Sequence, residues 1–284
     1  MPSSFLLKKN FSKNLTQHFS LPDSFWDKIS SLLPQPSQIR KIGRPPMDNR
    51  KAMTAICYIL HTGCQWKALP RYLGAKSTVH ARFQLWTRLG VFHKMWTLSL
   101  LSYDQIIGLH WQWQSLDGCH IVAPLGGNIT GPSYKHRGKT GSNRSLLTDE
   151  NGIPLAIVLA PANSNDFLLT ELTFESFAIP RPNPISIQQN LCLDKGYDYS
   201  EIDLALQKWQ YIPHIRRISE PILPPENRIH KPKRWVVERS HSWMNNFRSV
   251  FIRWARKASN YLAFLHFSCA LITFRAAKII PKIL

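Results

Sequence analysis

The sequence predicts an α/β protein, in which a mixed five-stranded sheet flanked by helices follows a smaller all-α unit. Two observations predict this division. Up to about residue 110, apolar residues recur at helical spacing between Gly and Pro residues, whereas short β-rich runs bounded by turn residues begin near residue 111. The chain has 284 residues, 44% of them hydrophobic, which is enough for two units. We therefore expect a helical unit at 1–110 and an α/β unit at 111–284, to which the observations below assign DNA binding and catalysis respectively.

Three helices are expected in the first unit. Asp48 is a candidate N-cap and Gly63 a candidate stop for the second helix, and Ser77 is a candidate N-cap for the third. A turn segment joins the second helix to the third, so this pair is helix-turn-helix-like. The helices are expected at residues 23–33, 48–63 and 75–90.

Two arginines on the third helix are candidate DNA contacts. Arg82 and Arg88 carry cationic groups that can bind phosphates or base edges. The alternative is that both belong to the solvated face of an amphipathic helix. The sequence alone leaves both interpretations open.

The second unit is expected to follow the order β-β-β-α-β-α-β-α. Glu150, Asn151 and Gly152 predict a hairpin turn between the second and third strands. A mixed sheet of this kind would bring the ends of the first and fourth strands side by side. The strands are expected at 111–123, 144–152, 153–162, 186–194 and 211–217, and the helices at 165–177, 199–210 and after Pro232.

Three acidic residues suggest a metal site. Asp117 and Asp194 each end a short hydrophobic run, and Glu238 lies in a stretch free of Gly and Pro for over two dozen residues, which predicts a helix. Three clustered carboxylates repel one another unless a divalent cation neutralises them. Oxygen ligands favour Mg²⁺ or Mn²⁺ over zinc. We expect two such ions, which suit phosphoryl transfer without a histidine base.

Each of these residues has a plainer interpretation. An Asp before Gly commonly forms a turn, and Glu238 taken alone would be a solvated surface acid. Asp149 and Asp198 compete as ligands, but Asp149 lies beside the hairpin and Asp198 is placed to cap the next helix. His120 is favoured as a structural residue over a general base.

The charge of the chain predicts a nucleic-acid partner. Lys and Arg number 36 against 17 Asp and Glu, a formal net charge of +19. Basic residues spread over several segments favour a long binding face on double-stranded DNA over a membrane surface. The five cysteines form no CxxC pair, and no apolar run reaches the ~20 residues that span a bilayer. We expect a cytoplasmic, nucleoid-associated protein with no membrane segment.

A basic segment at residues 132–144 is expected to be a flexible loop beside the metal site. Its cations are candidate phosphate contacts, with a merely solvated loop as the alternative. Lys195, which follows Asp194 directly, is a weaker candidate. The cations of the segment are Lys135, Arg137, Lys139 and Arg144.

Several motifs together resemble one family. Their blocks are spread over most of the chain, from residue 43 to residue 267. They read GRPPMDNRKAMTAICYILHTGCQWKALPRYLGAKSTVHARFQLWTRLGVF, SLDGCHI, HRGKTGSNRSLLTDENGIPLAIVLAPANSND, LDKGYD and RWVVERSHSWMNNFRSVFIRWARKASNYLAFLHF. These blocks resemble the DDE transposases of bacterial insertion sequences, in the insertion element five family, which have an RNase H-like catalytic core. The resemblance implies metal-dependent DNA cleavage at the element ends, transfer of the 3′-hydroxyl ends into target DNA, and a homo-oligomer on DNA. It also implies that Asp117, Asp194 and Glu238 are the catalytic triad.

The last motif of that family, Tyr-x2-Arg-x3-Glu-x6-Lys, is met only in part. Arg234 and Glu238 match it, whereas Lys231 and Asn245 occupy its two ends. The departure affects the expected DNA contacts, and Arg239 or Arg248 would supply the missing positive charge. Two other functions remain open, namely a non-catalytic DNA-binding regulator and a metal-dependent RNase H-like nuclease that cuts without joining.

Overall fold

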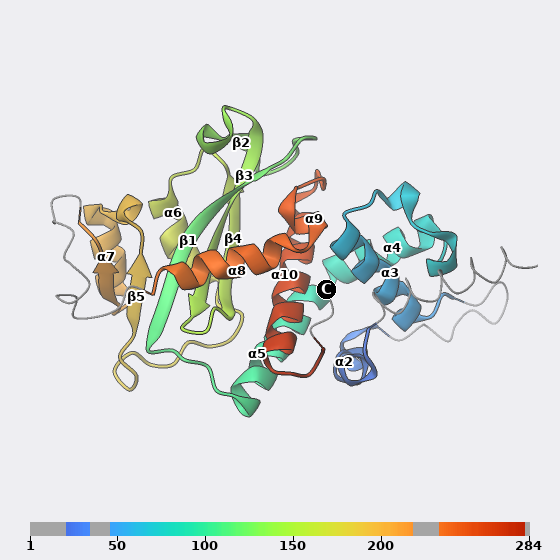
Figure 1. Cartoon of the computed structure of the whole chain (residues 1–284), viewed down its shortest axis with the longest axis horizontal. Coiled ribbons are helices and arrows are strands. Elements are labelled where there is room, and N and C mark those ends of the chain that lie inside the picture. Colours follow the sequence, from blue (N-terminus) through green and yellow to red (C-terminus); the bar gives the residue numbers. More distant parts are fainter. Residues whose placement is uncertain (1–20, 35–45, 218–232, 282–284) are drawn as a thin grey trace, which may run out of the picture.

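The computed structural model describes residues 21–34, 46–217 and 233–281. Most of the connector between the first two predicted helices, together with Lys231 and Pro232, lies outside these described residues. Within them, a twisted sheet occupies one end of an elongated molecule and a cluster of helices the other, with α5 and α10 between the two (Figure 1).

The helical unit has the predicted helices. The Asp48 carboxylate accepts a hydrogen bond from the Lys51 backbone N–H at 2.9 Å, and Gly63 ends the helix with a φ of 63°, so both predicted boundaries are confirmed. The prediction for Ser77 is wrong, because that helix already begins at Lys76. The elements are α2 (Asp23–Ile29), η1 (Ser30–Leu32), α3 (Asn49–Thr62), η2 (Trp66–Ala68), η3 (Arg71–Leu73) and α4 (Lys76–Arg88).

Two long helices, α5 (Val91–Ile106) and α10 (Ala258–Ala276), connect the helical unit to the sheet. Most of α10 is buried, as expected of a helix that is apolar on nearly every side. Its Phe264 stacks on Phe83 of α4 with ring centroids 4.8 Å apart, so α4 and α10 share one core. No helix among the described residues is long and apolar enough to cross a membrane.

The described part of the chain forms a sheet of six strands, one more than predicted. Its main path is β4-β3-β1-β5-β6, in which β5 and β6 run parallel to β1 while β3 runs antiparallel to both β1 and β4. Along this path only β3 runs opposite to the other four strands. This is the arrangement of an RNase H-like sheet. The additional strand β2 is a two-residue Gly-Pro segment, too short to give a sequence pattern. The strands are β1 (Trp113–Val122), β2 (Gly131–Pro132), β3 (Thr140–Asp149), β4 (Pro154–Pro161), β5 (Asn190–Leu193) and β6 (Ile212–Ile215).

Helices cover the sheet. Helix α8 (Trp235–Asn245) crosses in front of β1 and is followed by the short α9 (Arg248–Phe251), while α6 (Asp166–Glu175) lies behind the sheet and α7 (Ser200–Lys208) beside β5 (Figure 1). The continuous helix predicted around Glu238 is therefore interrupted. The chain becomes extended at Phe247, whose buried ring packs against His61 with centroids 4.8 Å apart.

Candidate metal and DNA site

Parallel strand pairing brings the two predicted aspartates together. Strand β5 pairs with β1 up to Ser115 opposite Cys192. Two residues further along each chain, at the same register and on the same face, come Asp117 and Asp194. Asp194 follows the end of β5, as predicted. Asp117 does not end its strand, because β1 continues to Val122 and pairs there with β3.

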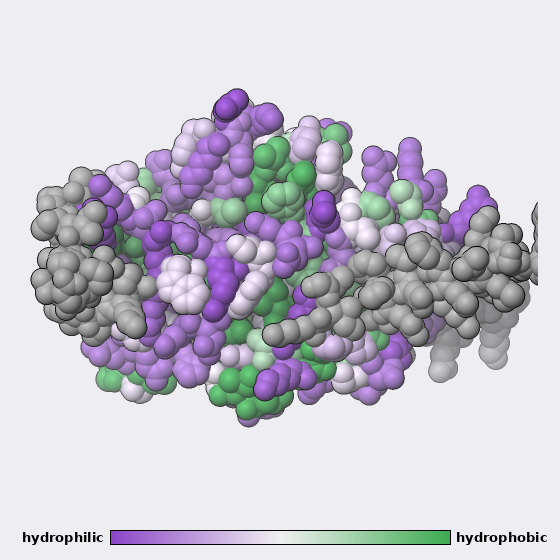
Figure 2. Space-filling view, in the orientation of Figure 1, coloured by the Kyte–Doolittle hydropathy of each residue, from purple (hydrophilic) through white to green (hydrophobic). Residues whose placement is uncertain are grey.

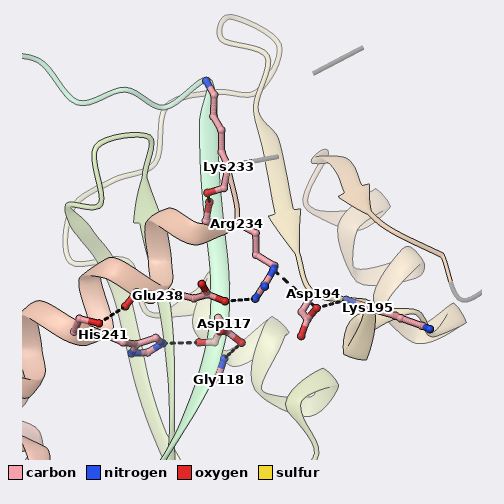
Figure 3. A network of polar contacts seen from close by, with 10 residues as sticks. Asp117, Gly118, Asp194, Lys195, Lys233, Arg234, Glu238 and His241 are labelled. Atoms are coloured by element: carbon pink, nitrogen blue, oxygen red, sulfur yellow. Dashed lines mark hydrogen bonds and ion pairs between the residues drawn. The ribbon is translucent and has the colours of Figure 1, made fainter. Parts of the chain in front are cut away.

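Helix α8 supplies the third carboxylate. The Arg234 guanidinium, at the N-terminus of α8, lies 2.5 Å from Glu238 Oε1 and 3.9 Å from Asp194 Oδ1. Figure 3 shows the side chains of Asp117, Asp194 and Glu238 gathered around this guanidinium. The Asp194 and Glu238 carboxylates are each about half exposed, so these ion pairs are open to solvent.

Asp117 has a different environment. Burial raises the pKa of its carboxyl group to about 6, and the nearby Asp194 adds to this effect. The Gly118 backbone N–H, which donates to Asp117 Oδ1 at 2.8 Å, and the cations of Lys135 and Arg234 oppose the rise. A partly buried carboxylate whose pKa is raised by its surroundings is a candidate cation ligand, because a bound cation would oppose that rise.

The three carboxylates suit a hard divalent cation, although their oxygen atoms do not converge on a single point. Across residues 21–34, 46–217 and 233–281, no three His, Cys, Asp or Glu side chains are close enough to share an ion. The guanidinium of Arg234 stands between two of the carboxylates and neutralises part of their charge. All three side chains offer only oxygen atoms, the donors that Mg²⁺ and Mn²⁺ prefer.

The competing acidic residues have structural partners. Asp149 is fully buried and accepts hydrogen bonds from the backbone N–H groups of Ile153, Asn151 and His110, so it holds the hairpin turn. Burial raises its pKa to about 6 as well. Asp198 does not cap α7 but forms an ion pair with Arg217 at 2.6 Å.

His120 has a structural setting. Its Nδ1 is 2.9 Å from the Ser133 hydroxyl, and its ring contacts Tyr134 with centroids 4.8 Å apart. Burial lowers its pKa. These contacts favour the structural interpretation.

One predicted cation does not lie in the expected loop. Arg144 was expected in a flexible loop, but strand β3 begins at Thr140 and the Arg144 side chain is fully buried behind α8. It cannot touch a phosphate from there. The long strand was not apparent because polar residues of β3, among them Ser142 and Asn143, are buried as well.

The other predicted cations remain near the surface. Lys135 is exposed and close enough to Asp117 to affect its pKa, whereas Arg239 lies between the rings of Trp235 and Trp243 and donates to the Asn151 carbonyl. The Arg82 guanidinium donates a hydrogen bond to the Met47 backbone carbonyl at 3.3 Å. The structure leaves their predicted role in DNA binding untested. The remaining exposed candidates are Arg88, Arg137, Lys139, Lys195 and Arg248.

The sequence did not single out several residues at this site. Asp166, at the start of α6, accepts a hydrogen bond from Asn143 at 2.6 Å behind Gly118, and the Tyr197 hydroxyl is buried near it with no hydrogen-bond partner in the described ranges. His241 of α8 is buried against β1, with its Nε2 3.4 Å from the Asp117 carbonyl oxygen. Only the side-by-side placement of β1, β3 and α6 reveals these neighbours.

Comparison with known proteins identifies the family. A family model described as "Transposase DDE domain" matches residues 114–272, more than half of the chain. The chain belongs to the DDE transposases. A second model, described as "Putative transposase of IS4/5 family", matches residues 21–96 of the transposase. The expected family is thereby confirmed, and with it an enzyme that cleaves DNA and transfers strands.

Individual relatives agree with this assignment. The transposase is 35% identical over 158 residues to the "Putative transposase for insertion sequence element IS402" of Burkholderia cepacia, covering 52% of this chain and 70% of that protein. It is also 37% identical over 93 residues to an uncharacterized 16.2 kDa protein of the same element, covering 30% of this chain and 63% of the relative. Solved complexes of the Mos1 transposase align over 82–95% of this chain and 81–94% of theirs. Their 12–13% identity and TM-scores of 0.26–0.29 are too low to carry an argument.

Proposed function

We propose that this transposase cuts double-stranded DNA at the ends of its insertion sequence and joins the 3′-hydroxyl ends to target DNA, using two divalent ions held by Asp117, Asp194 and Glu238. The observation that carries the proposal is the register between β1 and β5. It sets two carboxylates level on adjacent strands, beneath a helix that delivers the third.

The donor set fits Mg²⁺ or Mn²⁺ because it consists of carboxylate oxygens from three separate elements. When bound, the ions would neutralise the carboxylates, activate the attacking oxygen and stabilise the leaving oxygen of an in-line displacement at phosphorus. Arg234 is ion-paired with Glu238 and lies near Asp194, so its guanidinium must give way as these two carboxylates turn to a cation. Arg234 is then available to a DNA phosphate.

The attacking oxygen comes from water in the cleavage step and from a DNA 3′-hydroxyl in the joining step, so no covalent protein intermediate is required. The face that carries α8 is largely hydrophilic (Figure 2). The exposed Lys135 lies near Asp117 and the exposed Lys195 follows Asp194, a placement suited to holding the phosphates on either side of the cut.

The proposed division of labour follows the two units. The helices within 1–110, including Arg82 and Arg88 on α4, would bind the element ends, and 111–284 would perform the chemistry. Joining both ends of one element to a target requires both ends to be held together. We therefore expect a homo-oligomer on DNA, acting in the cytoplasm at the nucleoid.

The test is a cleavage and joining assay with purified protein, Mg²⁺ or Mn²⁺, and the DNA that flanks the reading frame, with Asp194→Asn beside the wild type. Strand joining that needs both the metal ion and Asp194 supports the proposal. Metal-dependent cleavage without joining would instead indicate a nuclease, and DNA binding that ignores both the metal ion and Asp194 would indicate a regulator.

A further inference from the structure

Arg144 is a buried cation without an acidic partner among the described residues. Its side chain extends from β3 into the layer between the sheet and α8 and is fully buried. Its Nη2 donates to His241 Nδ1 at 3.0 Å and to Asn245 Oδ1 at 3.4 Å. The guanidinium also lies close enough to the Tyr261 side chain of α10 to affect its pKa, while no hydrogen-bond acceptor among the described residues lies in bonding geometry to Nε or Nη1. A buried guanidinium is costly to maintain, so its retention beside the triad calls for a reason.

The contact with Arg144 fixes the protonation of His241. A guanidinium can only donate hydrogen bonds, so Nδ1 must accept and the ring proton resides on Nε2. That Nε2 lies 3.4 Å from the backbone carbonyl oxygen of Asp117, to which it donates. The hydrogen bonds therefore run in one direction, from the Arg144 guanidinium through the His241 ring to the Asp117 carbonyl.

Through His241, these hydrogen bonds connect α8, which carries Glu238, to the backbone of Asp117. Glu238 and Asp117 are two of the three proposed metal ligands. His241 lies three residues after Glu238 and so shares its face of α8. It reaches the peptide of Asp117 itself, as Figure 3 shows. Contacts across the layer hold α8 against the sheet, among them this hydrogen bond and that of the Ser240 hydroxyl with the Gly152 carbonyl at 2.7 Å.

We propose that Arg144 and His241 are positioning residues, which set the distance between the Asp117 and Glu238 carboxylates and thereby the affinity for divalent cations. Neither residue touches DNA or a cation in this role. The inference rests on the proposed function, since it assumes that these carboxylates bind the ions. Groups that orient metal ligands typically change metal affinity by about 10–100-fold when removed.

The experiment measures Mn²⁺ binding to the DNA-free transposase by electron paramagnetic resonance, a readout that does not depend on turnover. Arg144→Met removes the donors while filling most of the volume. His241→Gln keeps a donor near the Nε2 position, and His241→Asn keeps only an acceptor near Nδ1. The matched control is Arg253→Met, which removes another fully buried arginine that binds backbone carbonyls, including that of Ile129 at 2.8 Å.

We expect Arg144→Met and His241→Asn to weaken Mn²⁺ binding by about tenfold or more, and His241→Gln to retain much of the affinity. Arg253→Met should lower the unfolding temperature without changing Mn²⁺ binding. The inference is overturned if folded His241→Asn binds within about twofold of the wild type, or if Arg253→Met causes the same loss. If Arg144→Met does not fold, the pair of His241 variants still decides.

Asp194→Asn separates this inference from the proposed function. If Asp194→Asn binds Mn²⁺ as tightly as the wild type, the proposed metal site itself is wrong. If Asp194→Asn abolishes binding while the Arg144 and His241 variants bind normally, the site stands and only the positioning role fails.

Discussion

The guanidinium of Arg234 lies 2.5 Å from the carboxylate of Glu238, one helical turn away at the start of α8. The same guanidinium is 3.9 Å from Asp194. One cation therefore serves two carboxylates that, by our proposal, bind divalent ions. In the absence of a metal ion it limits their repulsion, and in its presence it competes for the same oxygens.

Removing this competitor should tighten metal binding. We expect Arg234→Gln to lower the Mn²⁺ dissociation constant of the DNA-free protein by about two- to fivefold, since an exposed ion pair contributes about 0.2–1 kcal/mol. The measurement is a Mn²⁺ titration followed by electron paramagnetic resonance. Arg217→Gln, which removes a cation bound to Asp198 and Asp203, is the control and should leave the constant unchanged. Weaker Mn²⁺ binding by Arg234→Gln would contradict the competition.

Asp117 should make folding stability depend on pH in the metal-free protein. Its pKa rises from 3.8 to about 6 on folding, chiefly through burial, so the folded state holds this proton more tightly than the unfolded state. The resulting stabilisation is complete below about pH 4 and is lost as the pH rises through about 6. At pH 8 the ionised carboxylate costs about 1–3 kcal/mol.

Asp117→Asn removes this cost. We expect the variant to gain stability over the wild type, by more at pH 8 than at pH 4, in urea unfolding without metal ions. Asp194→Asn is the comparison, because its carboxylate is about half exposed and water screens the change. A gain from Asp117→Asn that is equal at both pH values would show that the carboxyl group is not responsible.

The sequence predicted the helices and strands better than it predicted which residues contact one another in the folded chain. Asp48 and Gly63 mark their helix by local chemistry, and the β-rich runs around Asp117 and Asp194 are strands as expected. Local patterns failed where distant packing decides. Arg144 lies in a segment rich in Gly, Ser and cations, yet α8 and α10 bury it. No sequence pattern within ten residues of Arg144 indicates that its hydrogen-bond partner is His241, which is 97 positions away.

The break after α8 has the same origin. No Gly or Pro interrupts residues 233–251, so helical propensity favours one continuous helix. The chain leaves the helix at Phe247 because its ring, buried beside His61 of α3, stabilises the fold more than one further turn. Tertiary packing thus overrides a correct local preference.

Lys135 should bind DNA mainly through a phosphate. It is exposed and close enough to Asp117 to act on its pKa. We expect Lys135→Gln to weaken binding to DNA of any sequence and to reduce the slope of log binding constant against log salt by about 0.9. Fluorescence anisotropy across a salt series measures the slope. Lys208→Gln, at an exposed lysine of α7 paired with Glu171, is the control, and equal slopes for the two variants would contradict the assignment.

Gly118 should be required by the close approach of α6 to β1. A Cβ at this position would lie 2.6 Å from Asp166 Oδ1 and 3.2 Å from Asn143 Oδ1, and these two side chains are hydrogen-bonded to each other at 2.6 Å. The Asp166 carboxylate can move, but only by breaking its hydrogen bond with the Asn143 side chain. We expect Gly118→Ala to lower the free energy of unfolding by about 1–3 kcal/mol, the usual cost of overpacking.

Urea unfolding of Gly118→Ala beside Gly196→Ala provides the measurement. An added Cβ at Gly196 meets no heavy atom of residues 21–34, 46–217 or 233–281 within 4 Å, so that variant should match the wild type although it also lies close to Asp194. Adding Asp166→Ala to Gly118→Ala removes the atom that the methyl group would meet. If steric conflict is the cause, the double variant loses less than the sum of the two single losses. Additive losses would mean that Gly118 is needed for another reason, such as the strand conformation that lets its N–H reach the Asp117 carboxylate.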